Sequence, residues 1–264
     1  MSLKIAVCIK PVPDPECYDR ITIDPIKKTL VRKDIPSVIS SADKHALELA
    51  VQMRERHDGS ISVFSMAPPE ARAQLLEALA FGADDAYLLS DRRVGGADTL
   101  ATSYALSALI QHVGHYDMIL LGNESDDGAT AHVPSQLGEW MSLPHMTDAV
   151  GVRVESDSAV LVDKEFETGI ARYRVQLPCV IAVRKTINDV RYIPVKNFFA
   201  AKRKPLTVLG ADDLALDNAY IGLNGSPTKP GELITPQYSR NTVPIEGTDE
   251  EIAQAIIDKI KIYM

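Results

Sequence analysis

The sequence predicts an α/β protein: a three-layer α/β/α, doubly wound and mostly parallel sheet, with added antiparallel strands and a long C-terminal arm. Strand-like and helical patterns alternate five times before residue 145, which is typical of a parallel sheet covered on both faces. Four strand-like runs separated by turns then follow between residues 150 and 183. From Arg184 the periodicity weakens, and residues 209–244 are punctuated by Gly and Pro. A segment this long rarely folds on itself, so we expect it to wrap a partner subunit.

The first elements follow from simple patterns. Residues 3–9 are an apolar run, which predicts a buried strand that ends at the prolines after it. Residues 21–34 alternate between polar and apolar around an Asp-Pro pair, which predicts a hairpin. Ser40 or Ser41 can cap a helix that runs to His57.

The later elements repeat this logic. Further strands are predicted wherever a short apolar or alternating run is bounded by turn-forming residues: 61–66, 86–89, 117–121, 150–154, 159–164, 169–176 and 179–183. Helices are predicted at the periodic segments 68–81, 98–113 and 131–141. Thr248 and Glu251 form a capping-box pattern that begins a last amphipathic helix. We therefore expect a domain over residues 1–208 and an arm over residues 209–264.

Composition excludes several classes of protein. The chain has 264 residues, a net charge of −8 and a sequence pI of about 5.3, which argue against nucleic acid and against anionic membrane surfaces as partners. Cys8, Cys17 and Cys179 are too widely spaced for a metal or disulfide framework. No apolar run approaches the roughly 18 residues of a membrane span, and we see no signal peptide. We expect a cytoplasmic protein with no membrane insertion.

Residues 89–103 are the most informative stretch of the chain. Gly95 and Gly96 allow a sharp turn after a strand, and Asp98 or Thr99 can cap the helix that follows. The N–H groups at such a helix start can bind a phosphate. A second polar loop follows the next strand, after Gly122. Two such loops at neighbouring strand ends predict a nucleotide site, although a plain helix cap would explain the Asp-Thr pair alone.

Over almost its whole length, the chain resembles the β (small) subunit of electron transfer flavoprotein. The order and spacing of several motifs carry this resemblance: Cys8-Ile-Lys10-Pro-Val-Pro13-Asp14, Ser65-Met-Ala-Pro-Pro69, Glu77-Ala-Leu-Ala-Phe-Gly82-Ala83-Asp84, Asp98-Thr99-Leu-Ala-Thr102-Ser103, Asp127-Gly128-Ala-Thr130-Ala-His-Val, Leu177-Pro178-Cys-Val-Ile and Asn188-Asp-Val-Arg191-Tyr192. The segments Leu89-Ser-Asp-Arg92 and Leu223-Asn-Gly225-Ser226-Pro227-Thr228 are most similar to the electron-bifurcating members from anaerobes.

This resemblance implies a function. In bifurcating members the β subunit holds FAD, which takes a hydride from NADH and splits the electron pair. One electron goes to ferredoxin or flavodoxin, and the other goes through an α-subunit FAD to an acyl-CoA or hydroxyacid dehydrogenase. In the common aerobic members the same site holds a structural AMP, which is one alternative. The other alternative is an ATP-binding protein of the same architecture.

The resemblance also implies site residues. The nucleotide-binding positions carried over from the family are Cys8, Ser40, Ser41, Ala42, Asp43, Met66, Asp98, Thr99, Thr102, Ser125, Asp126, Asp127, Gly128, Ala129, Thr130, Ala131, His132, Val133, Pro134, Ser135 and Gln136. The chain departs from the usual family residues at Ser40, Ala129 and Pro134. The family's recognition loop for the partner dehydrogenase falls on Arg191, Tyr192, Val195, Phe198 and Phe199. We predict no catalytic acid or base and no metal.

Overall fold

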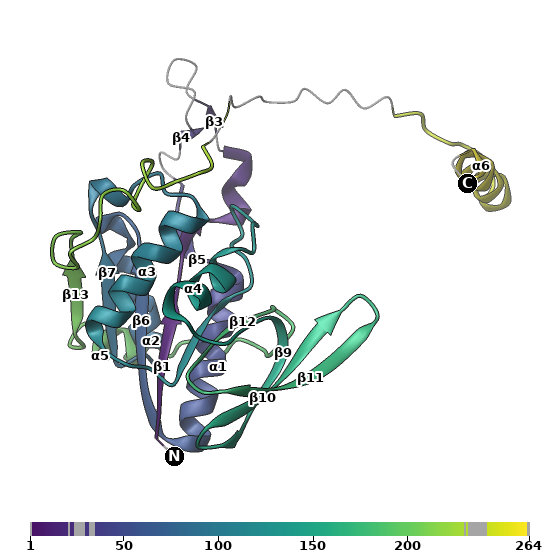
Figure 1. Ribbon diagram of the computed structural model, residues 1–264. Coiled ribbons are helices and arrows are strands. Elements are labelled where there is room, and N and C mark those ends of the chain that lie inside the picture. The colour runs from purple at the N-terminus through teal and green to yellow at the C-terminus, as the bar shows by residue number, and fades with distance from the viewer. Residues whose placement is uncertain are drawn as a thin grey trace. The chain divides into compact units, whose positions relative to one another are not determined.

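The computed structural model describes residues 2–20, 22–23, 30–31, 35–229, 231 and 242–262. The chain divides into two compact units, Met1–Gly231 and Glu232–Met264, which are described separately. The first unit holds the sheet and most of the helices (Figure 1).

A nine-stranded sheet forms the centre of the first unit. In spatial order its strands are β11 (Gly169–Gln176), β10 (Ala159–Phe166), β9 (His145–Ser156), β12 (Cys179–Val183), β8 (Met118–Gly122), β1 (Leu3–Cys8), β6 (Gly59–Met66), β7 (Asp85–Leu89) and β13 (Leu206–Leu209). Every neighbouring pair from β9 to β13 is parallel, whereas β10 pairs antiparallel with both β9 and β11. The predicted fold class is therefore confirmed.

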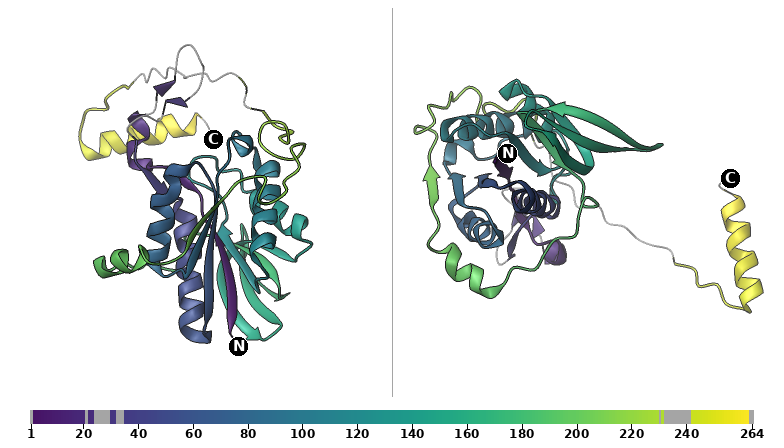
Figure 2. Two further views of the ribbon diagram at one scale, coloured as in Figure 1. Left: turned by 90° about the vertical axis from the view of Figure 1, so that its left-hand side faces the viewer. Right: turned by 90° about the horizontal axis from the view of Figure 1, so that it is seen from below.

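Helices cover both faces of this sheet, as the view from below shows (Figure 2). One face carries α1 (Ser41–His57) and α2 (Arg72–Phe81), with α5 (Val195–Ala201) packed against α2. The other face carries α3 (Thr99–Val113) and α4 (Val133–Met141). The sheet side chains alternate between two separate hydrophobic clusters, one on each face.

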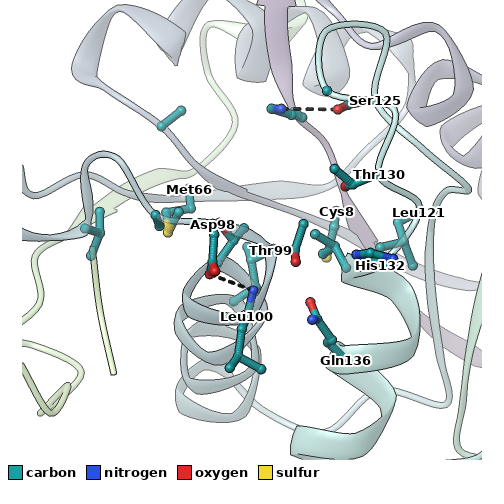
Figure 3. Close-up of a pocket in the computed structure, with 18 of the residues that line it drawn as sticks. Cys8, Met66, Asp98, Thr99, Leu100, Leu121, Ser125, Thr130, His132 and Gln136 are labelled. Carbon is teal, nitrogen blue, oxygen red and sulfur yellow. Dashed lines mark hydrogen bonds between the residues drawn. The ribbon is translucent and has the colours of Figure 1, made fainter. Parts of the chain in front are cut away.

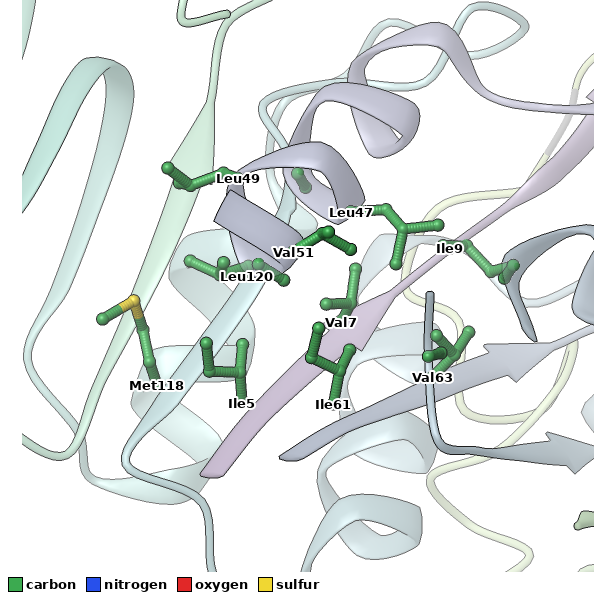
Figure 4. Close-up of a cluster of buried hydrophobic side chains, with 14 of the residues drawn as sticks. Ile5, Val7, Ile9, Leu47, Leu49, Val51, Ile61, Val63, Met118 and Leu120 are labelled. Atoms are coloured by element: carbon green, nitrogen blue, oxygen red, sulfur yellow. The ribbon is translucent and has the colours of Figure 1, made fainter. Parts of the chain in front are cut away.

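The first cluster shows why the strands read as continuous apolar runs. Leu47 and Val51 of α1 pack over Ile5, Val7 and Ile61 of the central strands (Figure 4). The intervening residues of the same strands face the second cluster, so strands such as β8 are buried along their whole length. Burial on both faces is the reason that parallel strands lack a polar–apolar alternation.

The segment after β1 differs from the prediction in detail. The prolines that were expected only to end the first strand form a short strand of their own, β2 (Pro11–Pro13), which pairs antiparallel with β5 (Ser37–Ile39). A two-stranded edge tolerates proline because few ladder donors are needed there. A 3-10 helix, η1 (Pro15–Arg20), follows β2.

The hairpin expected over residues 21–34 is described only in part. Its described part is β3 (Thr22–Ile23) paired antiparallel with β4 (Leu30–Val31), and the remainder lies outside the described residues. Two further 3-10 helices, η2 (Pro69–Ala71) and η3 (Arg92–Val94), precede α2 and α3.

The segment that follows β13 stays with the first unit. The boundary expected between residues 208 and 209 falls within β13, and Ala211, Leu216 and Ile221 are buried in the second cluster. In the second unit, α6 (Asp249–Lys261) begins at the predicted capping box of Thr248 and Glu251. That residues 209–264 wrap a partner stays a prediction.

The described residues include no helix with the combined length and apolar character that crossing a membrane requires. The cytoplasmic location stays a prediction.

Candidate functional site

A large cavity lies at the carboxyl ends of the central strands. Its volume is about 1340 Å³, and its lining includes Cys8 at the end of β1, Met66 at the end of β6 and Leu121 near the end of β8 (Figure 3). The N-terminal turns of α3 and α4 also line it. This is the edge at which ligands bind in open parallel sheets, because loops and helix N-termini converge there.

The start of α3 is built as the sequence predicts. Asp98 is the N-cap, and its Oδ1 accepts hydrogen bonds from the N–H groups of Leu100 and Ala101 at 3.0 and 3.1 Å. Gly96, at φ 71°, makes the left-handed turn before it. Asp98, Thr99 and Leu100 all line the cavity, so the positive end of the α3 dipole faces it.

The loop after β8 is held by two adjacent aspartates. Asp127 accepts a hydrogen bond from Lys10 Nζ at 2.6 Å, and Lys10 Nζ also donates to Ser125 Oγ at 3.2 Å. Asp126 accepts one from the N–H of Ser41 at 2.6 Å. The loop is thereby tied to the ends of β1 and β5, and its residues are placed along the cavity.

Two alanines in this loop adopt a conformation that side chains disfavour. Ala129 and Ala131 have φ values of 45° and 55°, in the left-handed region. For residues other than glycine this region costs roughly 1–2 kcal/mol each. Strain of this kind is concentrated at ligand sites, where the surrounding contacts enforce it.

A buried carboxylate supports the floor of the site. Asp43 Oδ2 accepts the N–H of Lys10 at 2.8 Å, and Oδ1 accepts the N–H of Gly122 at 2.7 Å, so one side chain joins the ends of β1 and β8. A Cβ at Gly122 would lie 2.7 Å from Oδ1, so only glycine fits there. Burial raises the pKa of Asp43 to about 7, although the two backbone hydrogen bonds oppose that rise.

This pKa predicts a pH-dependent stability. Because the folded-state pKa is above the ordinary value of about 3.9, the folded protein binds the proton more tightly, and stability falls as pH rises from about 4 to 7. Between pH 5 and pH 8 this loss amounts to roughly 2–3 kcal/mol. Urea unfolding of the wild type and of Asp43→Asn at both pH values measures it. The variant should lose less stability over that interval, and equal losses would contradict the assignment.

The cavity contains no activated nucleophile among its described residues. Burial raises the pKa of the Cys8 thiol far above its ordinary range, so Cys8 is a neutral lining group. No group of three or more His, Cys, Asp or Glu side chains in the described part of the chain is arranged to hold a metal.

The structure brings most of the predicted nucleotide-binding residues together. Those that line the cavity are Cys8, Asp43, Met66, Asp98, Thr99, Thr102, Ser125, Gly128, Thr130, Ala131, His132, Val133, Pro134 and Gln136. Those outside its lining are Ser40, Ser41, Ala42, Asp126, Asp127, Ala129 and Ser135. Of this second group, Ser40 and Asp126 are joined by two hydrogen bonds, which hold the loop after β8 in place.

The side-chain amide of Gln136 is incompletely hydrogen-bonded. Its side chain lies at the cavity (Figure 3), and its Oε1 is buried with no hydrogen-bond partner in the described structure. An unsatisfied buried acceptor costs about 1–3 kcal/mol. A ligand with a donor group, such as the exocyclic amine of adenine, would satisfy it.

The sequence did not predict several of the lining residues. Lys10, Arg92, Pro227 and Thr228 all line the cavity. Lys10 and Arg92 follow strand ends, and the general rule for open sheets points to such positions. The resemblance singled out the segment 223–228 but not its place at the cavity, because Thr228 reaches Asp98 across 130 residues of sequence.

The predicted partner-binding residues divide into two kinds. Tyr192, Val195, Phe198 and Phe199 expose 98%, 74%, 41% and 67% of their surface, and we call these four side chains the docking patch. Arg191 instead turns inward to α1.

The guanidinium of Arg191 is held by two glutamates of α1. It donates to both carboxylate oxygens of Glu48 at 2.9 Å and to Glu55 at 2.6 Å. The Glu48 side chain is only 3% exposed, which makes the pair strong enough to anchor the segment. Arg191 thus fixes the chain that carries the docking patch.

Comparisons with known proteins agree on one family. The model of the "Electron transfer flavoprotein domain" matches residues 27–214. The chain is 39% identical over 259 residues to the electron transfer flavoprotein subunit beta of Thermoanaerobacterium thermosaccharolyticum and 38% identical over 259 residues to that of Clostridium acetobutylicum. It is 38% identical over 261 residues to subunit CarD of the caffeyl-CoA reductase-Etf complex of Acetobacterium woodii. Each alignment covers 98% of both chains.

Proposed function

Because this chain belongs to the electron transfer flavoprotein family, as one of its β subunits, we propose that it holds FAD in the large cavity. The proposed complex is a heterodimer with an α subunit that carries a second FAD. In it, electrons from NADH are divided between ferredoxin or flavodoxin and, through the α-subunit FAD, a partner dehydrogenase. The bound FAD would supply hydride acceptance and one-electron transfer, and the protein would supply binding and electrostatics.

The size of the cavity favours FAD over AMP as its ligand. Sites for small ligands usually measure roughly 300–1,000 Å³, and this cavity measures about 1340 Å³. A mononucleotide at the α3 or α4 end would leave much of it filled with water. A dinucleotide can span both helix N-termini and the strand ends between them.

The residue types also suit a dinucleotide. The α3 N-terminus and the cation Arg92 provide positive potential for a diphosphate. Thr99, Thr102 and Thr130 provide hydroxyl groups, and Cys8, Met66 and Leu121 provide an apolar surface for a planar ring.

The docking patch supports a partner dehydrogenase. Four large apolar side chains are exposed together on one short segment, and exposed aromatic residues are typical of the centre of protein interfaces. A relative belongs to a caffeyl-CoA reductase complex by its name, which favours an enzyme acting on acyl-CoA as the partner. A hydroxyacid dehydrogenase is the other candidate.

We expect Phe199→Ala to weaken this docking. Loss of a central aromatic side chain at an interface costs about 1–3 kcal/mol, so the KM for the partner dehydrogenase should rise about fivefold or more in an electron-delivery assay. Nucleotide content should not change, because Phe199 is not part of the cavity lining. Val208→Ala, at a half-exposed position on β13, is the matched control. An unchanged KM for Phe199→Ala would count against the docking patch.

An anaerobic NADH titration of the heterodimer tests the proposed reaction. Under this proposal NADH bleaches the flavin absorbance, and the reduced protein transfers electrons to ferredoxin only while the dehydrogenase acceptor is present. A heterodimer whose flavin does not respond to NADH would favour a simple electron carrier with AMP in this cavity.

A further inference from the structure

The segment 222–228, which we call the strap, is fitted closely to the loop before α3. Gly222 has a φ of 56°, and a Cβ there would lie 2.0 Å from the carbonyl oxygen of Arg93. A Cβ at Gly96 would lie 2.9 Å from the side chain of Leu223. Both glycines are therefore required for the strap and the loop to approach each other.

Ser226 fastens the strap from inside. Its side chain is buried, its hydroxyl donates to the carbonyl of Gly222 at 2.6 Å, and its Oγ accepts the N–H of Asp98 at 2.8 Å. The backbone N–H of Asp98, the N-cap residue of α3, is thus hydrogen-bonded to the strap.

Thr228 makes the second attachment. Its N–H and its hydroxyl both donate to Oδ2 of Asp98, at 3.0 and 2.6 Å. Since Oδ1 already accepts two N–H groups of α3, each carboxylate oxygen has two donors, which is its full capacity. These donors hold the pKa of Asp98 below its ordinary range, although burial opposes them. Asp98 therefore has no acceptor capacity left for a ligand hydroxyl.

We propose that Thr228 is a positioning residue for the nucleotide. Its two hydrogen bonds to Asp98, which we call the clasp, fix the strap along the cavity and orient the first turn of α3. Pro227 and Thr228 line the cavity beside Asp98 and Thr99, so a released strap would open that part of the wall. The identity of the occupant rests on the proposed function. The clasp itself rests only on the contacts described above.

The test compares three variants of the heterodimer. Thr228→Val removes the hydroxyl and keeps the N–H, Thr228→Ser keeps both, and Thr207→Val changes an exposed threonine of β13 as the matched control. The first readout is amide hydrogen exchange at Asp98 and Thr228. The second is FAD remaining per heterodimer after prolonged dialysis, measured by absorbance and mass spectrometry.

In Thr228→Val these amides should exchange at least tenfold faster, and the FAD content should fall from two towards one per heterodimer. Thr228→Ser and Thr207→Val should behave as the wild type. Exchange and FAD retention that are unchanged in Thr228→Val would overturn the inference. A wild-type heterodimer without FAD in this cavity would refute the proposed function and the nucleotide role of Thr228. In that case the amide exchange rates of Thr228→Val would still test whether Thr228 holds the strap on Asp98. Unchanged exchange rates would overturn this structural role as well.

Discussion

Ending the chain after Gly231 should leave the first unit folded and abolish its association with the α subunit. Among the described residues, the two hydrophobic clusters of the first unit are built from residues 3–221, all of which the truncated chain keeps. Within α6 no side chain is buried, and Ile256, Ile257 and Ile260 expose 45%, 47% and 52% of their surface. Burying one such side chain against a partner contributes roughly 1.5–3 kcal/mol, so losing three should weaken binding by at least a hundredfold.

Co-purification with a tagged α subunit measures this, with circular dichroism to verify the fold of the truncated chain. Gln254→Ala, an exposed polar position on the same helix, is the control and should bind normally. A truncated chain that still co-purifies would show that residues 232–264 are not the arm that holds the partner.

Asp98→Ala should release the nucleotide. It removes Oδ1, which accepts two N–H groups at the start of α3, and Oδ2, which anchors the strap. Loss of an N-cap costs about 0.5–2 kcal/mol of stability, and the loss of the strap comes in addition. Nucleotide dissociation should be at least a hundredfold faster, and Thr99→Ala added to it should weaken retention further.

Asp98→Asn separates the two roles of this side chain. The asparagine carbonyl can still cap α3, but its NH₂ would face the N–H and hydroxyl of Thr228. Dissociation should therefore be faster than in the wild type with little loss of thermal stability. If Asp98→Ala keeps its full nucleotide content, the α3 N-terminus is not part of the site.

Features that rest on contiguous residues could be predicted from the sequence. The apolar runs predicted the parallel strands, because burial on both faces leaves no alternation. The Asp98-Thr99 pair after two glycines predicted the α3 cap, because helix capping acts within four residues. The resemblance to a family then indicated the loops that the structure places around the cavity.

Features that depend on distant residues could not be predicted. Thr228 reaches Asp98 across 130 residues, and Arg191 reaches Glu48 across 143. In the sequence Arg191 is one more basic residue in a surface segment, and only the fold shows that α1 holds it. The β2–β5 pair was missed for another reason, since prolines normally mark the end of a strand.

The measurement that tests the central claim most directly is the nucleotide content of this chain purified with its α subunit. The complex is denatured, and the released nucleotides are identified by mass spectrometry and counted by absorbance. The proposed function predicts two FAD per heterodimer, one of them in the cavity of this chain. One FAD and one AMP would contradict it and make this chain the structural subunit of a simple electron carrier, and ATP in place of both would contradict the electron-transfer role.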